Sequence, residues 1–357
     1  MPKREISIAF QTDKRAADYI ALAKLVNDYA FDAVTVYCDA PYQPSFGPLL
    51  LMAPHIERAR IGPAGIPPSR MHPLDIAAGT ALLADVARAG TYLGLVRGSW
   101  LADHGIRELK PPLAAMRESI TIIRKLLAGE SAGMKGRVFQ IAEHARAPYP
   151  LPGGRIPLQI GTWGKMMAAL AGELADEVKI GGSANPALIP WMAEQIAQGE
   201  ARAKRPPGTV KIVIGAVSVV DDDRDAARFA ARKAVALYLP IVSQLDPTNP
   251  PQSPHQDGGK LSLREGEGSP EPELLERIAA LVAAGDSDGA ARLVPDDILD
   301  RFAFAGNAAD IIQQCERLFD AGAQRIELGT PHGVADSTHG IRLIGGRVLP
   351  ALASYFM

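Results

Sequence analysis

Short apolar segments alternate with longer segments of helical periodicity along most of the chain. The apolar segments are rich in Ile, Val and Leu and predict buried strands. They lie at 5–10, 32–37, 90–96, 157–161, 209–220 and 324–329. Between them, segments such as 15–31, 73–88 and 111–130 carry apolar residues at helical spacing. This alternation predicts a parallel sheet with helical crossovers.

About eight strand–helix units fit into the 357 residues. The pattern permits a closed barrel or an open doubly wound sheet, and the count of eight favours a TIM (β/α)8 barrel with insertions. No linker or internal repeat divides the chain, so we expect a single domain over 1–357. Residues 244–272 are rich in proline, glycine and charge and bury little apolar surface. They are interpreted as a mobile insertion, either a lid or a solvated loop.

Composition narrows the class of protein. The formal net charge is −2, whereas a nucleic-acid-binding surface needs a clustered basic excess. Apolar runs are interrupted well before the length of a membrane span, and the N-terminus does not resemble a signal peptide. Two cysteines make no disulfide framework, and there is no HExxH, paired CxxC, P-loop or GxSxG motif. We therefore expect a cytoplasmic enzyme without a metal site that acts on a small molecule.

A glycine-bracketed turn, "IGTWGKMM", joins one predicted strand to the helix that follows it. In a parallel barrel, ligands bind at the carboxyl ends of the strands. Gly161 and Gly164 allow tight backbone geometry, and the first amides of the next helix, with Lys165 beside them, outline an anion site. Glycines also occur at such turns for steric reasons alone.

Several segments together carry a family resemblance. They include "RIGPAGIPPSRMHPLDIAAGTALL", "TYLGLVRGSW", "IPLQIGTWGKMMAALAGELADEVKIGGSANP" and "FAGNAADIIQQCERLFDAGAQRIELGTPHG". In this order they resemble the bacterial luciferase-like superfamily, in particular its coenzyme F420-dependent branch, which holds 5,10-methylenetetrahydromethanopterin reductase. The resemblance implies a TIM barrel with a deazaflavin, or alternatively FMN, across its C-terminal mouth. The implied activity is hydride transfer between F420 and an organic substrate. An FMN-dependent monooxygenase and a non-catalytic cofactor-binding barrel are the alternatives.

The resemblance also assigns residues to the cofactor. One set forms the turn that holds its phosphate: Gly161, Thr162, Trp163, Gly164, Lys165 and Met166. A second pair, Ala64 and Gly65, matches a strand bulge whose non-prolyl cis peptide backs the ring; the same stretch is also consistent with a rigid turn. The end of the fourth strand adds Arg97, Gly98 and Ser99, with Trp100 as a wall of the substrate site.

Departures from the family pattern leave the proton-transferring group open. The strand-1 glutamate of the reductase is Ala9 here, and the frequent Asp-His pair after strand 2 is Cys38–Asp39. We predict Asp39 as the catalytic residue, with His72 and Tyr37 as further candidates. Gln11 and Cys38 also qualify by position. For each of these residues the alternative is a loop residue without a catalytic role.

The resemblance further implies a homodimer that pairs through early helices. The small-residue run 76–90 allows close contact between subunits, and it is also consistent with a surface buried within one chain. Near the C-terminus, His332 and His339 flank a turn without metal-ligand spacing and are interpreted as a solvated loop.

Overall fold

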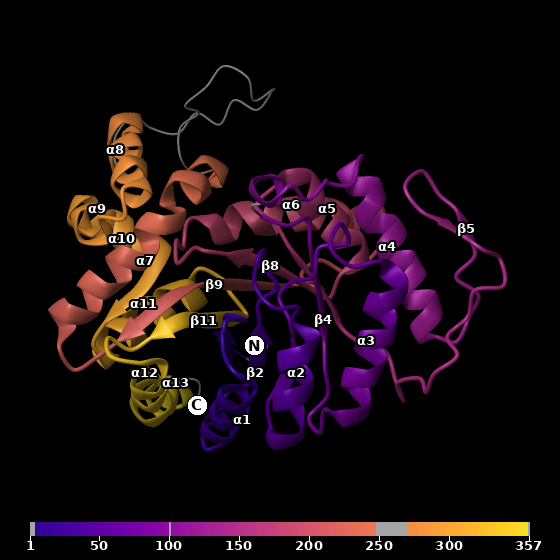
Figure 1. The fold of residues 1–357 in the computed structure, drawn as a ribbon, viewed down its shortest axis with the longest axis horizontal. Coiled ribbons are helices and arrows are strands. Elements are labelled where there is room, and N and C mark those ends of the chain that lie inside the picture. The colour runs from indigo at the N-terminus through magenta and orange to yellow at the C-terminus, as the bar shows by residue number, and fades with distance from the viewer. Residues whose placement is uncertain (1–3, 100, 248–269, 356–357) are drawn as a thin grey trace. The chain divides into compact units, whose positions relative to one another are not determined.

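The computed structural model describes residues 4–99, 101–247 and 270–355. The described chain divides into two compact units. The larger contains residues 5–179 and 194–211, and the smaller contains Arg4, residues 180–193 and those from 212 onward. Figure 1 follows the elements of both. The predicted insertion at 244–272 lies outside the described residues except at its ends, where α7 stops at Leu245 and α8 starts at Pro272.

The larger unit is built on parallel strands in chain order. These are β1 (Glu5–Phe10), β2 (Ala33–Val36), β3 (Arg60–Pro63), β4 (Leu93–Val96), β7 (Leu158–Gly161) and β8 (Glu177–Gly181), whose last two residues belong to the smaller unit. Bridges Ile61–Thr91 and Ile66–Leu95 join β3 to β4. The connecting helices are α1 (Ala16–Asn27), α2 (Phe46–Met52), α3 (Pro73–Val86), α4 (Pro112–Leu127) and α5 (Lys165–Leu174). The predicted strand–helix alternation is confirmed in this unit.

A buried ionic cluster lies at the N-terminal ends of these strands. Arg60 of β3 pairs with Glu5 of β1 and, at 2.8 Å, with Glu177 of β8. Gln159 of β7 donates to the other oxygen of Glu177 at 3.1 Å. Because β1 and β8 are the outer strands of this unit, Arg60 can reach both only if the sheet is curled. In barrel enzymes this end serves stability and the opposite end serves function.

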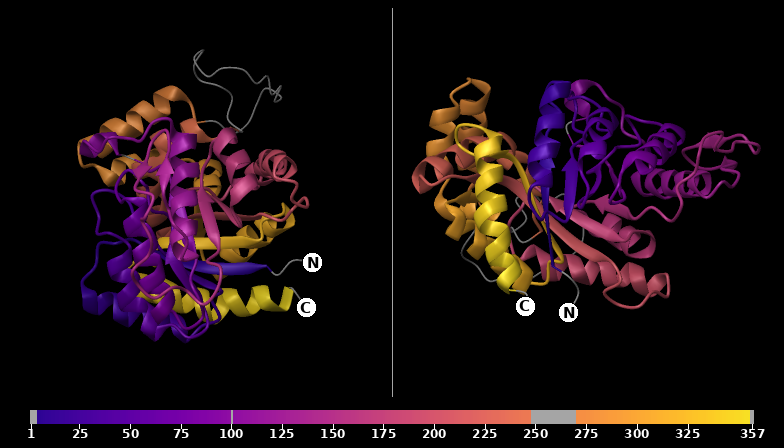
Figure 2. Two further views of the ribbon diagram at one scale, coloured as in Figure 1. Left: turned by 90° about the vertical axis from the view of Figure 1, so that its right-hand side faces the viewer. Right: turned by 90° about the horizontal axis from the view of Figure 1, so that it is seen from below.

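A small hairpin, β5 (Met134–Lys135) with β6 (Gln140–Ile141), follows α4 and projects from the larger unit (Figures 1 and 2). Glu118 of α4 accepts hydrogen bonds from the backbone N–H groups of Arg137, Val138 and Phe139, at 2.7–2.9 Å. Burial acts to raise the pKa of Glu118, but these three bonds outweigh it, so the pKa lies below its usual value. The carboxylate therefore anchors the hairpin to the helix.

The smaller unit has β9 (Lys211–Val220), whose first residue belongs to the larger unit, between β10 (Ala303–Gly306) and β11 (Arg325–His332), all parallel. Its helices are α7 (Arg224–Leu245), α8 (Pro272–Ala283), α9 (Ser287–Leu293), α10 (Asp296–Phe302), α11 (Ala308–Asp320), α12 (Ser337–Leu343) and α13 (Leu349–Tyr355), with a π-helical turn at Ile344–Val348. The remaining helix, α6 (Leu188–Arg202), passes from this unit into the larger one.

The interpretation of His332 as part of a solvated loop is wrong. Its side chain is fully buried at the end of β11, where Nδ1 lies 2.6 Å from the Ser337 hydroxyl and Nε2 lies 3.3 Å from the Leu328 carbonyl. His339 is partly exposed, and its backbone N–H donates to the Asp336 carboxylate at 2.9 Å. Strand β11 runs three residues further than its apolar pattern indicates, and this carries the imidazole into the core.

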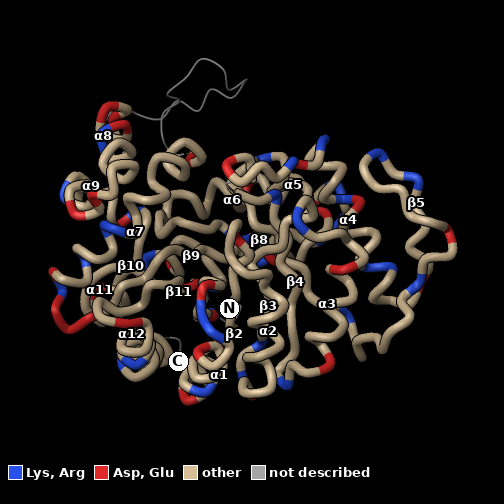
Figure 3. The backbone as a smooth tube through the Cα atoms, viewed as in Figure 1, with Lys and Arg blue, Asp and Glu red and all other residues tan. Residues whose placement is uncertain are grey.

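Acidic and basic residues are intermixed along the outer helices and loops (Figure 3). Within the described residues, none of the helices combines the length and the apolar character that crossing a membrane requires.

Candidate functional site

The predicted site residues gather at the carboxyl ends of adjacent strands in the larger unit. Asp39 follows β2, the Ala64–Gly65 pair follows β3, Arg97 follows β4, and Gly161 ends β7. In parallel β/α folds this edge collects the ligand-binding loops. The structure therefore brings the sequence-predicted residues to one side of one sheet.

The bulge after β3 has the backbone geometry that the resemblance implies. The peptide bond between Ala64 and Gly65 is cis. On one side, Ala64 N–H donates to the Val36 carbonyl of β2 at 3.0 Å. On the other side, Ile66 N–H donates to the Gly94 carbonyl of β4 at 2.8 Å. The bulge is thus fixed by both neighbouring strands, and its contact with a cofactor ring stays a prediction.

The side chain of Val96 explains two of the glycines. A Cβ added to Gly65 would lie 2.9 Å from Val96 Cγ1, and one added to Gly161 would lie 2.7 Å from the same atom. Val96 and Gly161 are also register partners between β4 and β7. Atoms in a close-packed interior do not approach so closely. A side chain at 161 would therefore displace Val96, which favours the steric explanation for this glycine.

Gly164 has a different environment. It is the N-cap residue of α5, with φ −91°, and an added Cβ would meet only Thr162 Oγ1, at 3.7 Å. As a glycine it has no side chain to cap the helix, and its own N–H donates to Thr162 Oγ1 at 2.9 Å. Gly164, Lys165 and Met166 are exposed, while Thr162 and Trp163 are partly buried. The first amides of α5 and the positive end of its dipole thus face open space, which fits an anionic group.

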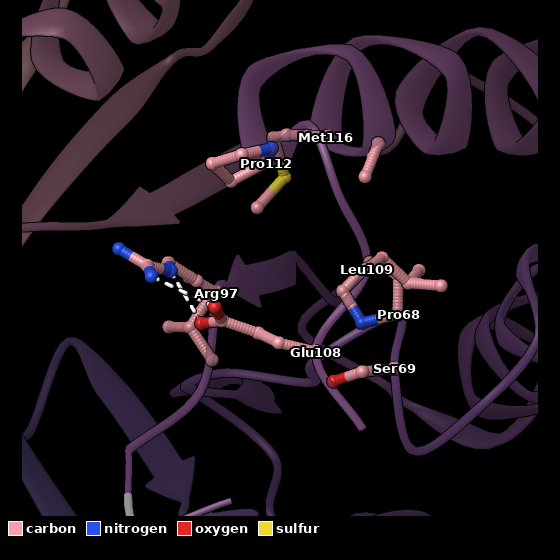
Figure 4. A pocket seen from close by; sticks show the side chains of 9 residues that line it. Pro68, Ser69, Arg97, Glu108, Leu109, Pro112 and Met116 are labelled. Atoms are coloured by element: carbon pink, nitrogen blue, oxygen red, sulfur yellow. Dashed lines mark hydrogen bonds and ion pairs between the residues drawn. The ribbon is translucent and has the colours of Figure 1, made fainter. Parts of the chain in front are cut away.

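Arg97 forms an ion pair with another residue of the chain (Figure 4). Its guanidinium binds the Glu108 carboxylate through two hydrogen bonds, the Nη2–Oε2 one at 2.8 Å, and these lower the pKa of Glu108. The pair borders a hollow with ≈ 260 Å³ of empty space, part of it open to solvent. The hollow is lined by Pro68, Ser69, Val96, Arg97, Glu108, Leu109, Pro112, Ala115 and Met116.

The two residues after Arg97 differ in how they are constrained. Gly98 has φ +105°, a conformation that favours glycine, and a Cβ there would lie 2.7 Å from Leu101 Cδ1. Ser99 is exposed, and Trp100 lies outside the described residues. A cofactor contact of Arg97, Gly98 or Ser99 stays a prediction.

Asp39 is held in a polar cluster at the end of β2. Gln11 Nε2 donates to Asp39 Oδ2 at 3.1 Å. Arg70 donates to the carbonyl groups of Cys38, at 2.7 Å, and Tyr42, at 3.3 Å, and so fixes the loop on both sides of Asp39. Burial raises the pKa of Asp39, and the Gln11 hydrogen bond and the charges of Lys179 and Arg70 only partly offset this. A carboxyl with a raised pKa at a strand end suits proton transfer.

Lys179 completes this cluster and was not predicted from the sequence. It lies in β8, is 6% exposed, and pairs in register with Gly161. Its Nζ lies 4.9 Å from the centroid of the Tyr37 ring. The available signal was a lone lysine between two apolar residues, Val178 and Ile180. Strand periodicity places it on the opposite face from both of them.

His72 has a structural position. It is the N-cap residue of α3, where Nδ1 accepts a hydrogen bond from Leu74 N–H at 3.3 Å. Its exposed ring packs edge-on against Phe139, with ring centroids 5.5 Å apart. Cys38 is buried. The structure thus brings Tyr37 and Asp39 together with Lys179, and it uses His72 to cap a helix.

Comparisons with known proteins agree over nearly the whole chain. 5,10-Methylenetetrahydromethanopterin reductase of Archaeoglobus fulgidus is 28% identical over 349 residues, which cover 98% of this chain and 99% of that protein. The structure of the coenzyme F420-dependent tetrahydromethanopterin reductase from Methanopyrus kandleri superposes with a TM-score of 0.83 at 23% identity, covering 98% and 99%. An F420-dependent secondary alcohol dehydrogenase in complex with an F420–acetone adduct gives 0.75 at 17% identity, with the same coverage.

The structural likeness confirms the predicted TIM (β/α)8 barrel. A family model described as "luciferase-like monooxygenase" matches residues 5–325. This match covers most of the chain, including every residue of the site described above. The chain therefore belongs to the luciferase-like monooxygenase family.

Proposed function

We propose that the protein is an F420-dependent oxidoreductase that transfers a hydride between the deazaflavin and an organic substrate. Two similar proteins carry F420 dependence in their names, and both align over 98% of this chain. The observation that carries the proposal is the uncapped N-terminus of α5, because it supplies an anion site at the strand ends. Gly164 leaves that site open to a ligand.

The residues present fit the cofactor in two places. The amides of Lys165 and Met166, together with the Lys165 ammonium, would hold its phosphate, and Thr162, which accepts the Gly164 N–H at 2.9 Å, would flank it with Trp163. The cis bulge at Ala64–Gly65 would back the ring. When bound, F420 supplies hydride chemistry at its carbon 5, while the protein binds and orients it.

Asp39 would accept or donate the proton that accompanies the hydride. Oxidation of an alcohol or amine removes a hydride and a proton, and the ionised carboxyl of Asp39 accepts the proton. In the reductive direction the protonated carboxyl returns it. The Gln11 hydrogen bond fixes one carboxyl oxygen, and Arg70 fixes the loop that carries it. Tyr37 borders the same cluster through the contact between its ring and Lys179.

The test is anaerobic assay of the purified protein with F420 against a panel of alcohols, ketones and methylene-pterins. We expect substrate-dependent absorbance changes of the deazaflavin. Activity only with reduced FMN and oxygen would instead identify an FMN-dependent monooxygenase, which the matching family's description makes the second candidate. Binding of neither cofactor would identify a non-catalytic barrel.

We also propose that the protein is a homodimer. The small-residue run on α3 is used partly inside the chain, because a Cβ on Gly79 would lie 2.5 Å from the Phe46 ring. The outer face of α3 nevertheless exposes Leu74 and Leu82, which offers apolar surface to a second copy. Analytical ultracentrifugation should give a dimer for the natural protein and a monomer for Leu82→Glu.

A cytoplasmic location is consistent with the cysteines. Cys38 and Cys315 are both free and buried, as expected in a reducing compartment. Fractionation of the source cells with a soluble marker enzyme tests this location.

A further inference from the structure

Lys179 is a buried cation in a strand that is otherwise apolar at its centre. Its neighbours Val178 and Ile180 are fully buried on the opposite face of β8. A buried charged group is weak evidence for stability, because well-packed apolar residues of similar volume often serve as well or better. A lysine at this position therefore calls for a role other than packing.

The surroundings of Lys179 point to the acid–base cluster. Its Nζ lies 4.9 Å from the centroid of the Tyr37 ring, and Tyr37 is two residues before Asp39. The carboxyl of Asp39 receives one hydrogen bond from Gln11 at the end of β1. Arg70, from the loop after β3, donates hydrogen bonds to the backbone carbonyls of Cys38 and Tyr42.

Two positive charges thus act on Asp39 from different elements, Lys179 from β8 and Arg70 from the β3 loop. Arg70 holds the loop in place, so its removal would also move Asp39. Lys179 lies on another strand, and Asp39 accepts a hydrogen bond from Gln11. Lys179 is therefore the group whose charge can be changed while the Asp39 loop keeps its anchors.

We propose that Lys179 is the positioning residue for proton transfer, holding the Asp39 carboxyl in its ionised, proton-accepting form through its charge. This inference rests on the proposed function. In the oxidative direction the substrate gives a hydride to F420 and a proton to the Asp39 carboxylate, so two electrons and two hydrogens leave the substrate. The protonated Asp39 carboxyl beside the Lys179 cation then releases its proton to water, and Asp39 is again ionised.

The first test uses the protein without cofactor. Aspartate labelled with ¹³C at the carboxyl carbon is followed by NMR against pH, and Asp39→Asn identifies the resonance. In Lys179→Met the Asp39 titration should move to higher pH by about one pH unit or more, the usual size of one neighbouring charge. Lys179→Arg keeps the charge and should titrate like the natural protein. So should Lys135→Met, which removes an exposed lysine of the hairpin.

Equal titration of Asp39 in Lys179→Met and the natural protein would overturn the proposal. Lys179→Gln supplies a second neutral variant if the methionine does not fold, as checked by circular dichroism. With F420 and an active substrate from the panel, the pH profile of hydride transfer should move in the same direction as the NMR titration. The Kd for F420 should stay within about twofold. Failure of the natural protein to bind F420 would end the proposed function, while the NMR titration would still report on the Asp39–Lys179 coupling.

Discussion

The packing of Val96 against Gly161 gives a quantitative prediction. Alanine at 161 would place its Cβ 2.7 Å from Val96 Cγ1, about 1 Å inside the normal carbon–carbon contact. Overpacking of this kind costs about 1–3 kcal/mol of unfolding free energy. Val96→Ala removes the obstructing methyl groups. Val96 is only partly buried, so this change should lower the unfolding free energy by about 1–2 kcal/mol, from two carbons at about 0.8 kcal/mol each.

The two substitutions should therefore compensate. In the double variant the new methyl at 161 occupies space left by Val96, and replacing glycine also lowers the entropy of the unfolded chain. We expect the double variant to be about 1–2 kcal/mol more stable than the sum of the two single costs predicts. Urea unfolding followed by circular dichroism measures all four proteins of the cycle.

The control is Gly153→Ala, because an added Cβ at this exposed loop position meets no atom within 4 Å. It should change stability by less than about 0.5 kcal/mol. Strict additivity of Gly161→Ala and Val96→Ala would refute the packing explanation for Gly161.

The remaining predictions concern stability in the larger unit. The pKa of Glu118 is lowered in the folded protein, so the stabilisation from its carboxylate is complete above the usual pKa of a glutamate. It is lost as the pH falls through the lowered, folded-state pKa, where the carboxylate protonates and the hairpin loses its anchor. Hydrogen exchange should show early loss of protection at Val138 and Phe139, and Glu118→Gln should show weakened protection already at pH 7. Arg60→Met leaves the buried Glu177 carboxylate without its cation, while Glu5 keeps its pair with Lys211. It should destabilise the protein by about 3 kcal/mol in urea unfolding, whereas Arg88→Met at a surface pair should have an effect near zero.

Much of the larger unit follows from local patterns. Strand 5–10 coincides with β1, and the proline-initiated segments at 73–88 and 111–130 are α3 and α4, each ending two or three residues early. These elements bury apolar residues at one period throughout, so periodicity alone identifies them. The prediction did not include α6 or the helices between 272 and 302. Two of these, α9 and α10, are seven residues each and too short to show a clear period, whereas α8 carries apolar residues at helical spacing that the prediction overlooked. The two-residue strands of the hairpin are too short to show a period.

Site residues could be predicted from the sequence where they lie in a recognisable motif. They could not be predicted where their position depends on the register between neighbouring strands. The cis bond at Ala64–Gly65 and the exposed turn at Gly164 followed from recognisable segments. The proximity of Lys179 to Tyr37 depends on which strands are neighbours and how they are aligned, and neither is encoded in local spacing. The different roles of Gly161 and Gly164 likewise depend on a side chain from another strand.

The central claim is that the open N-terminus of α5 binds the anionic part of F420. It is tested most directly by fluorescence titration of the natural protein and of Gly164→Glu with F420, with Gly153→Glu placing the same charge on an exposed loop elsewhere. The account predicts micromolar binding by the natural protein and by Gly153→Glu, and a loss of at least about tenfold, or 1.4 kcal/mol, in Gly164→Glu. Equal affinity in all three proteins would contradict it.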